Sequence, residues 1–465
     1  MRLTDYVFAT EKLKKQYFDT VTMQVGLRYF GGKSIIGKYL LNRIFEMQAY
    51  RYKKNKTATT FVDCFTGGGK MALSIPTGWF ETIVMNDMDY GVYSYYVCCK
   101  ESPRALIEMI EVLGKVMCEE VYVICARERN KRGKGLTDAE MALFHLDKIQ
   151  CVDHKEHEKY EKGDMLLSAA MTYWVTQSSW LGETEHNAAN YALNKGDKNE
   201  KLEIENRVAL AKKRITQINT KMTRQHYVIE NLDYVDLIQK YLYDSDTGEK
   251  KEDAIFYLDP PYHAATLNRS NQLKKTKNGN DVSPASDKEK PAPYEVSFSY
   301  EQTNAMTYLL ATMKWFIKSD YDPSFFFRDP YEEETALNKG RLPADYFHDF
   351  DLIENRDQGF CRECLGSFHK GTSTGDDVGL EVIWSRYDGS EDSLQWMTDE
   401  KDKQLAEDFW KNKKELRERY LYVKRELYKC KMIVALLQTS DKEYEEFKKK
   451  KIKDALNSYE NKKNT

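Results

Sequence analysis

A glycine-rich turn between a strand pattern and a helix pattern is the feature that most restricts the fold of this chain. Residues 61–75 read FVDCFTGGGKMALSI, an apolar run followed by three glycines and an amphipathic stretch. Consecutive glycines allow a tight turn and leave backbone amides unobstructed. In open α/β sheets such a turn binds an adenosine-containing cofactor at the carboxyl edge. A glycine turn needed only for packing is the alternative interpretation.

An acidic residue follows the next strand pattern. Residues 82–85 read TIVM, a strand pattern that leads into Asn86 and Asp87. A carboxylate at such a strand end can accept hydrogen bonds from both ribose hydroxyls of a cofactor. The glycine turn and the acid together indicate a cofactor site more strongly than either feature alone.

A carboxylate, two prolines and an aromatic ring end a third strand pattern. Residues 254–258 are apolar, and YLDPPYH occupies positions 257–263. Asp259 and the carbonyl of Pro260 are two hydrogen-bond acceptors, and Tyr262 offers a flat face to a planar ring. Two acceptors and a stacked ring can hold an exocyclic amine for methylation. We expect that amine on a nucleobase, with a strand-ending turn and an incidental tyrosine as the alternative.

The charge balance restricts where nucleic acid can bind. The formal net charge of the 465 residues is -3, so a basic surface must be local. Residues 206–229 include no acidic residue, which makes them the best candidate for phosphate contacts. A solvated helix face remains the competing interpretation.

Periodicity divides the rest of the chain. From residue 103 to about 220 helical patterns dominate, which predicts an inserted helical domain. Short strand patterns at 325–327 and 382–384 are expected to complete the sheet. Beyond residue 387 a nearly heptad apolar stripe predicts a long charged helix.

Two further patterns leave alternatives open. The nine cysteines form no even framework, so reduced thiols are expected, although Cys361 and Cys364 with Cys151, His154 and His157 leave a zinc site open. The GKS at 32–34 suggests a phosphate-binding loop. Five residues separate Gly26 from Gly32 instead of four, which makes a nucleotide hydrolase only the second candidate.

Four motifs occur in an order typical of one family. They are RYFGGK (28–33), FVDCFTGGG (61–69), NDMD (86–89) and LDPPY (258–262). In this order they resemble the landmarks of the Dam-type adenine-N6 DNA methyltransferases. MTYWVTQSSWLG (171–182) and VSFSYEQTNAMTYLLATM (296–313) are also similar to segments of that family. The segment ETEHNAANYALNKG (183–196) does not match the recognition turn of the GATC enzymes.

The resemblance implies a Rossmann-like α/β methyltransferase sheet, interrupted by a helical target-recognition domain and followed by a helical extension. The expected catalytic domain is discontinuous, with residues 1–102 and 225–390. The recognition domain is expected at 103–224 and the charged extension at 391–465.

The resemblance also implies methyl transfer from S-adenosylmethionine to N6 of an adenine flipped out of duplex DNA, without a metal. The expected catalytic residues are Asp259, Pro260, Pro261 and Tyr262. The expected cofactor-binding residues are Tyr29, Phe30, Gly31, Gly32, Lys33, Asp63, Phe65, Thr66, Gly67, Gly68, Gly69, Asp87, Asp233 and Asp259. The expected DNA-binding residues are Arg207, Lys212, Lys213, Arg214, Lys221, Arg224 and Gln177.

Partners and location follow from the same reasoning. We expect double-stranded DNA as the main partner of a monomer or weak dimer, and a cognate restriction enzyme is an open possibility. With no apolar leader and no run of 18 apolar residues, a cytoplasmic protein of a bacterial cell or phage is expected. A methyltransferase that acts on RNA or protein amines and a catalytically silent DNA-binding protein are two further candidates.

Overall fold

A computed structural model describes twelve stretches of the chain, and these fall into two compact units. The first unit contains Met1–Pro261 and Trp315–Ser319, and the second contains the described residues of 306–314 and 320–386. The described stretches are residues 1–24, 26–29, 36–131, 136–143, 165–179, 191, 198–261, 306, 309–310, 313–322, 361–369 and 378–386.

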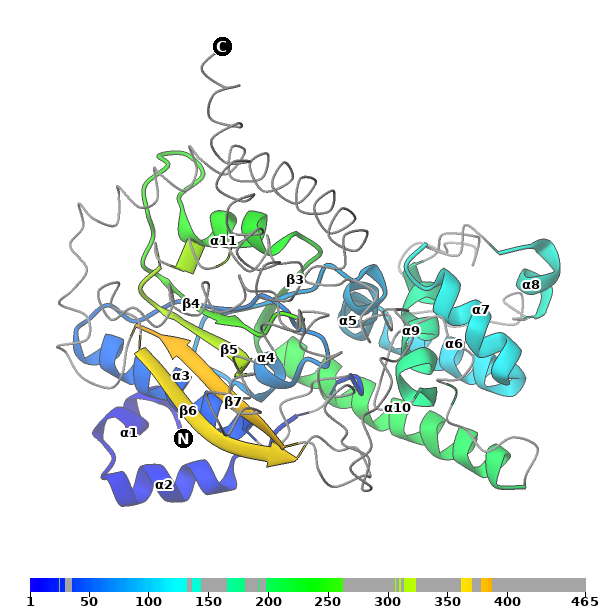
Figure 1. Cartoon of the computed structure of the whole chain (residues 1–465), viewed down its shortest axis with the longest axis horizontal. Coiled ribbons are helices and arrows are strands. Elements are labelled where there is room, and N and C mark those ends of the chain that lie inside the picture. Colours follow the sequence, from blue (N-terminus) through cyan, green and yellow to red (C-terminus); the bar gives the residue numbers. More distant parts are fainter. Residues whose placement is uncertain are drawn as a thin grey trace, which may run out of the picture. The chain divides into compact units, whose positions relative to one another are not determined.

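Five parallel strands form the sheet of the first unit (Figure 1). Their order is β3-β2-β1-β4-β5, and Phe61 of β1 pairs with Ile83 on one side and Ile255 on the other. All three of these side chains are fully buried, as expected for a parallel sheet covered on both faces. The strands are β1 (Thr60–Asp63), β2 (Thr82–Asn86), β3 (His226–Glu230), β4 (Ala254–Leu258) and β5 (Phe316–Asp322).

Helices from residues 3–101 and 234–242 pack beside this sheet. In α3, Leu40, Leu41 and Ile44 are fully buried at helical spacing, and Phe45 packs on Trp79 with ring centroids 4.1 Å apart. These contacts place the apolar face of α3 against the protein core. The helices concerned are α1 (Leu3–Phe8), α2 (Glu11–Thr20), α3 (Gly37–Lys53), α4 (Lys70–Ser74), α5 (Tyr90–Glu101) and α11 (Tyr234–Leu242).

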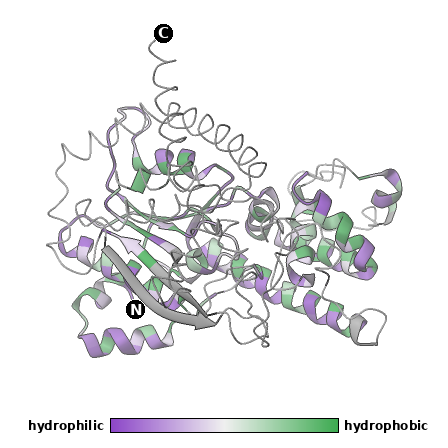
Figure 2. Cartoon of the chain, viewed as in Figure 1, coloured by the Kyte–Doolittle hydropathy of each residue, from purple (hydrophilic) through white to green (hydrophobic). Residues whose placement is uncertain are grey.

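The described part of residues 103–224 is almost entirely helical, as the sequence predicted. Its central helix is α9, where every residue from Leu166 to Ser178 is buried against α5, α6 and α7. Trp174 of α9 donates a hydrogen bond to the carbonyl of Ile110 at 2.9 Å. Figure 2 shows hydrophilic and hydrophobic residues alternating along α10. The helices are α6 (Pro103–Val116), α7 (Glu119–Glu128), α8 (Asp138–Leu143), α9 (Met165–Ser178) and α10 (Lys198–Arg224).

The second unit contains an antiparallel strand pair, β6 (Cys361–His369) and β7 (Val378–Ser385). The expected late strand at 382–384 lies within β7. The one expected at 325–327 lies outside the described residues, as does the charged extension at 391–465. Among the helices that the structure describes, none is long and apolar enough to span a bilayer.

Candidate functional site

The site lies where the order of the strands changes direction. From β1 the chain passes to β2 on one side, while β4 pairs on the other side of β1. Such a switch point leaves a crevice at the carboxyl ends of the two central strands. Asp63 ends β1 in register with Tyr257 of β4, two positions before Asp259. The fold therefore brings the glycine-turn motif and the DPPY motif to one edge.

Residues 65–69 form a tight turn that only glycine can complete. Gly67 and Gly69 have φ angles of 45° and 71°, a left-handed region that favours glycine. A Cβ on Gly67 would lie 2.9 Å from Cδ1 of Tyr29. The amide of Gly26 donates to the carbonyl of Gly68 at 3.0 Å. The predicted cofactor residues Tyr29 and Gly67 are thus neighbours, as the motif order implied.

Tyr96 of α5 packs against this turn, a contact that the sequence pattern did not indicate. Its buried hydroxyl donates to the carbonyl of Gly67 at 3.1 Å. A Cβ on Gly69 would overlap the same hydroxyl and lie 2.8 Å from Cζ. The pattern of tyrosines in 90–96 was the available signal, but it reads equally well as ordinary helix packing.

Replacing Gly69 by alanine is expected to destabilise the protein more than the same change at Gly78. Both glycines have positive φ, 71° and 81°, which costs an alanine about 1–2 kcal/mol. Only Gly69 also meets Tyr96, whereas nothing lies within 4 Å of a Cβ on Gly78. Overpacking adds about 1–3 kcal/mol at Gly69 alone. Urea unfolding of both variants measures the difference, and equal losses would contradict the close packing of Tyr96.

Asp87 stands at the end of β2 and faces the glycine turn. Its Oδ2 accepts the amide of Gly67 at 2.7 Å, and its Oδ1 accepts the amide of Asp89 at 2.9 Å. The residue is half-buried. A carboxylate offers about four acceptor positions, so two remain for a ligand. The geometry therefore suits the predicted role as acceptor of ribose hydroxyls.

Asn86 holds together the loops that follow β1 and β3 beside Asp87, a role that the sequence pattern did not indicate. Its Nδ2 donates to the carbonyls of Cys64 at 3.0 Å and Leu232 at 3.1 Å. Its Oδ1 accepts the amide of Leu232 at 2.9 Å, and its backbone carbonyl accepts the amide of Thr66 at 2.8 Å. The predicted cofactor residue Thr66 is therefore held by backbone. Asparagine directly after a buried strand was the available signal.

Burial and neighbouring acids raise the pKa of two carboxyl groups at this edge. Asp63 is buried, its Oδ2 accepts the amide of Ala72 at 3.3 Å, and its Oδ1 has no hydrogen-bond partner among the described residues. Burial, with the neighbouring charges of Asp259 and Asp87, raises the pKa of Asp63 to about 8. Burial and the charge of Asp89 raise the pKa of Asp87 to about 7. The charges of Asp259 and Asp87 therefore oppose ionisation of Asp63, and the charge of Asp89 opposes ionisation of Asp87.

Asp233 and Phe65 line the neighbouring loops. The carboxylate of Asp233 caps α11 by accepting the amide of Val235 at 2.9 Å. Phe65 packs on Tyr234, with ring centroids 5.7 Å apart. Both residues lie beside the turn that carries Gly67, but their contact with a cofactor stays a prediction.

Several expected site residues lie outside the described stretches. Of the first motif the structure describes Tyr29, and of the DPPY motif it describes Asp259, Pro260 and Pro261. Phe30, Gly31, Gly32, Lys33 and Tyr262 are not described, nor are Cys151, His154, His157 and the side chains of Cys361 and Cys364.

The basic run of α10 divides between two environments. Lys212, Lys213 and Arg224 are exposed, and Lys212 pairs with Glu111. Arg207 and Arg214 are half-buried beside Tyr173.

Of the expected DNA contacts, Lys221 is half-buried and bound to backbone, and Gln177 is buried. The ammonium of Lys221 donates to the carbonyls of Leu73 and Ile75, the latter at 2.7 Å, and burial lowers its pKa to about 8. Gln177 is buried within α9. The charge run indicated a basic helix correctly but could not separate its inward from its outward residues. Lys221 and Gln177 are therefore not available to contact DNA phosphates in this arrangement.

The parallel sheet, its glycine turn and the acid after β2 are typical of a Rossmann-like fold. The family model "D12 class N6 adenine-specific DNA methyltransferase" matches residues 29–321, more than half of the chain. The chain belongs to this family, and it is an adenine-specific DNA methyltransferase. The match runs from Tyr29 into β5 and confirms the resemblance seen in the motifs. No curated protein matches the chain.

Proposed function

We propose that this protein transfers a methyl group from S-adenosylmethionine to N6 of an adenine that is rotated out of duplex DNA. The observation that carries the proposal is the convergence of the glycine turn, Asp87 and Asp259 at the switch point of a sheet that belongs to the adenine methyltransferase family. An amino group inside a duplex is out of reach of a cofactor, so extrusion of the base is required.

The described residues suit this cofactor. S-adenosylmethionine, when bound, supplies an activated methyl group on a cationic sulfonium and also carries an ammonium group. The buried Oδ1 of Asp63 lacks a partner among the described residues, and the charges of Asp259 and Asp87 oppose ionisation of Asp63. A cationic ligand relieves that repulsion. Asp87 retains acceptor positions for the ribose, beside the unobstructed amides of the glycine turn.

Asp259 and Pro260 would orient the adenine amine. The carboxylate of Asp259 and the carbonyl of Pro260 accept its two N–H hydrogen bonds, which directs the nitrogen lone pair toward the methyl group. Proline has no N–H of its own, and its fixed φ keeps the carbonyl in place. Tyr262, the next aromatic residue, is proposed to stack on the extruded base.

One experiment tests the proposal directly. Purified protein is incubated with S-adenosylmethionine and unmethylated duplex DNA, and the digested nucleosides are analysed by mass spectrometry. We expect N6-methyladenine in DNA, and none in a matched RNA duplex. A product on cytosine, or methylation of RNA alone, would contradict the assignment. Calorimetry with the cofactor alone separates failure to bind from failure to react.

Exposed basic residues of α10 are proposed to contact DNA phosphates. Lys213 and Arg224 are exposed, and neither forms an ion pair among the described residues. Replacing both by alanine is expected to weaken binding to every duplex alike and to lower the salt-dependence slope by about 2. Duplex affinity measured against salt concentration tests this.

A matched control exists on another helix of the same unit. Lys12 and Lys15 of α2 are also exposed, and their replacement by alanine removes the same charge. The variant lacking Lys12 and Lys15 should keep the wild-type dependence of duplex affinity on salt concentration. If the two double variants behave alike, α10 is excluded from the interface and only net charge matters.

A further inference from the structure

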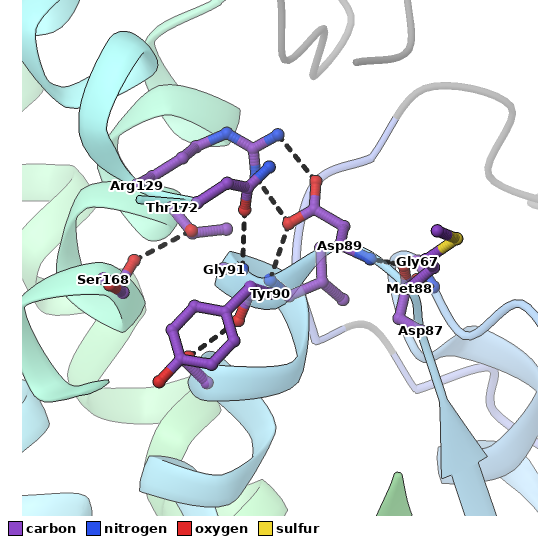
Figure 3. A network of polar contacts seen from close by, with 12 residues as sticks. Gly67, Asp87, Met88, Asp89, Tyr90, Gly91, Arg129, Ser168 and Thr172 are labelled. Carbon is purple, nitrogen blue, oxygen red and sulfur yellow. Dashed lines mark hydrogen bonds and ion pairs between the residues drawn. The ribbon is translucent and has the colours of Figure 1, made fainter. Parts of the chain in front are cut away.

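A buried ion pair joins the helical insert to the strand end that carries Asp87 (Figure 3). Nη1 and Nη2 of Arg129 donate to Oδ1 and Oδ2 of Asp89 at 2.7 and 2.6 Å. The two side chains are 0% and 4% exposed. Arg129 follows α7 as its C-cap, forty positions after Asp89. A bidentate pair of this kind fixes both charge and orientation.

Asp89 passes this constraint to Asp87 and to α5. Its backbone amide donates to Oδ1 of Asp87 at 2.9 Å. Its own Oδ1 caps α5 by accepting the amide of Val92 at 3.1 Å. The other oxygen of Asp87 accepts the amide of Gly67. A continuous set of hydrogen bonds therefore runs from Arg129 to the glycine turn.

Side chains of the helical insert leave the first turn of α5 no room to move by itself. Gly91 donates its amide to Oδ1 of Asn130 at 2.8 Å. A Cβ on Gly91 would overlap the hydroxyl of Thr172 on α9 and lie 3.1 Å from Nη1 of Arg129. Figure 3 shows Arg129 and Thr172 approaching this turn from the insert. Side chains of the insert thus fix the segment between Asp87 and α5.

We propose that Arg129 is a positioning residue for the cofactor site. Through Asp89, Arg129 holds the carboxylate of Asp87 in place and balances the negative charge around it. This rests on the proposed function of Asp87 as the ribose acceptor. It assigns to the helical insert a part in cofactor binding, in addition to the expected part in recognising DNA. The insert and the cofactor site would then respond to one another.

The charges around Asp87 favour this role. Asp89 lies two positions away, Asp63 ends the adjacent strand, and the nearby cation is Arg129. The charge of Asp89 raises the pKa of Asp87 and that of Arg129 lowers it, while burial is the largest cause of the upward shift. Without the guanidinium, Asp87 would ionise less readily and would be a poorer acceptor for hydroxyl groups near neutral pH.

The competing explanation is that the ion pair of Arg129 and Asp89 only stabilises the fold. Two measurements distinguish this explanation from a positioning role. One is the affinity for S-adenosylmethionine measured by calorimetry. The other is hydrogen exchange of the Gly67 amide in cofactor-free protein, resolved by fragmentation mass spectrometry. We expect Arg129→Met to weaken affinity and to speed Gly67 exchange by about tenfold each. Arg129→Lys should recover part of both, since it restores the charge without the bidentate geometry.

Arg127 provides a matched control on the same helix. It pairs with Glu128 at 2.6 Å and Glu140 at 3.0 Å, and neither acid contacts Asp87 in the described structure. Arg127→Met should leave both readouts within about twofold of wild type. If Arg127→Met and Arg129→Met change the readouts equally, or if folded Arg129→Met changes neither, the positioning role is overturned.

A second variant covers the case in which Arg129→Met does not fold, because it leaves Asp89 buried and unpaired. Combining it with Asp89→Asn removes that charge, while the amide oxygen can still cap α5. This double variant should still exchange Gly67 faster than wild type, and a wild-type exchange rate would overturn the proposal. If wild-type protein failed to bind the cofactor, the proposed function would be wrong, yet the exchange comparison would still decide the positioning role.

Discussion

Replacing Asp259 by alanine is expected to lower kcat for adenine methylation by about 10³-fold, because a preorganised acceptor acts mainly in the transition state. Cofactor affinity should fall much less. The fold should remain intact, since removing one acid relieves the repulsion that helps to raise the pKa of Asp63. Single-turnover methylation and urea unfolding measure the two effects separately.

Asp244 supplies the control for this variant. It lies in the turn before β4, where Oδ1 accepts the amides of Asp246 and Thr247 and Oδ2 pairs with Lys251 at 3.2 Å. Asp244→Ala should reduce stability and leave kcat unchanged. Near-normal turnover by Asp259→Ala on adenine-containing duplexes would show that this carboxylate does not hold the amine.

The local sequence pattern was sufficient to predict strands of the sheet and the motifs at its edge. Residues 254–258 form β4 with the predicted bounds, because an apolar run followed by Pro260 has few other solutions in a buried sheet. The acid after β2 was also correctly placed beside the glycine turn. Strand and turn depend on neighbours in sequence, so their signal is local.

Contacts between distant segments could not be read in the same way. Lys221 belongs to an acid-free run that indicated a phosphate-binding face, yet its ammonium binds carbonyls in the 73–75 segment. Arg129 appears as one more charge in a polar stretch, although it is fully buried against Asp89. Which way a helix turns its charges depends on tertiary packing, which periodicity alone does not give.

The raised pKa values of Asp63 and Asp87 predict that cofactor affinity depends on pH. In free protein these pKa values are about 8 and about 7. A cationic ligand lowers both, so binding releases protons and affinity should rise with pH until about 8. Each proton released contributes up to about tenfold per pH unit. Calorimetry between pH 6 and 8.5 should therefore show a gain of at least about tenfold.

Stability of the cofactor-free protein should change in the opposite direction. The folded-state pKa values of Asp63 and Asp87 lie above the unfolded value, so the stability linked to these groups is fully present below about pH 4. It is lost progressively as pH rises from about 4 and is gone above about 8. Unfolding measured over this range should show a decline, whereas saturating cofactor should reduce that decline.

Asp63→Asn isolates one of the two groups. Its amide oxygen can still accept the amide of Ala72, but the side chain no longer titrates. We expect cofactor binding to release about one proton fewer, so that affinity rises less steeply with pH. The loss of affinity relative to wild type should be largest at high pH. Asp244→Asn is the control, because the pKa of Asp244 is lowered to about 2 by the amides of Thr247 and Asp246 and cannot contribute above pH 6. A wild-type slope in Asp63→Asn would show that Asp63 is not the group that a bound cation influences.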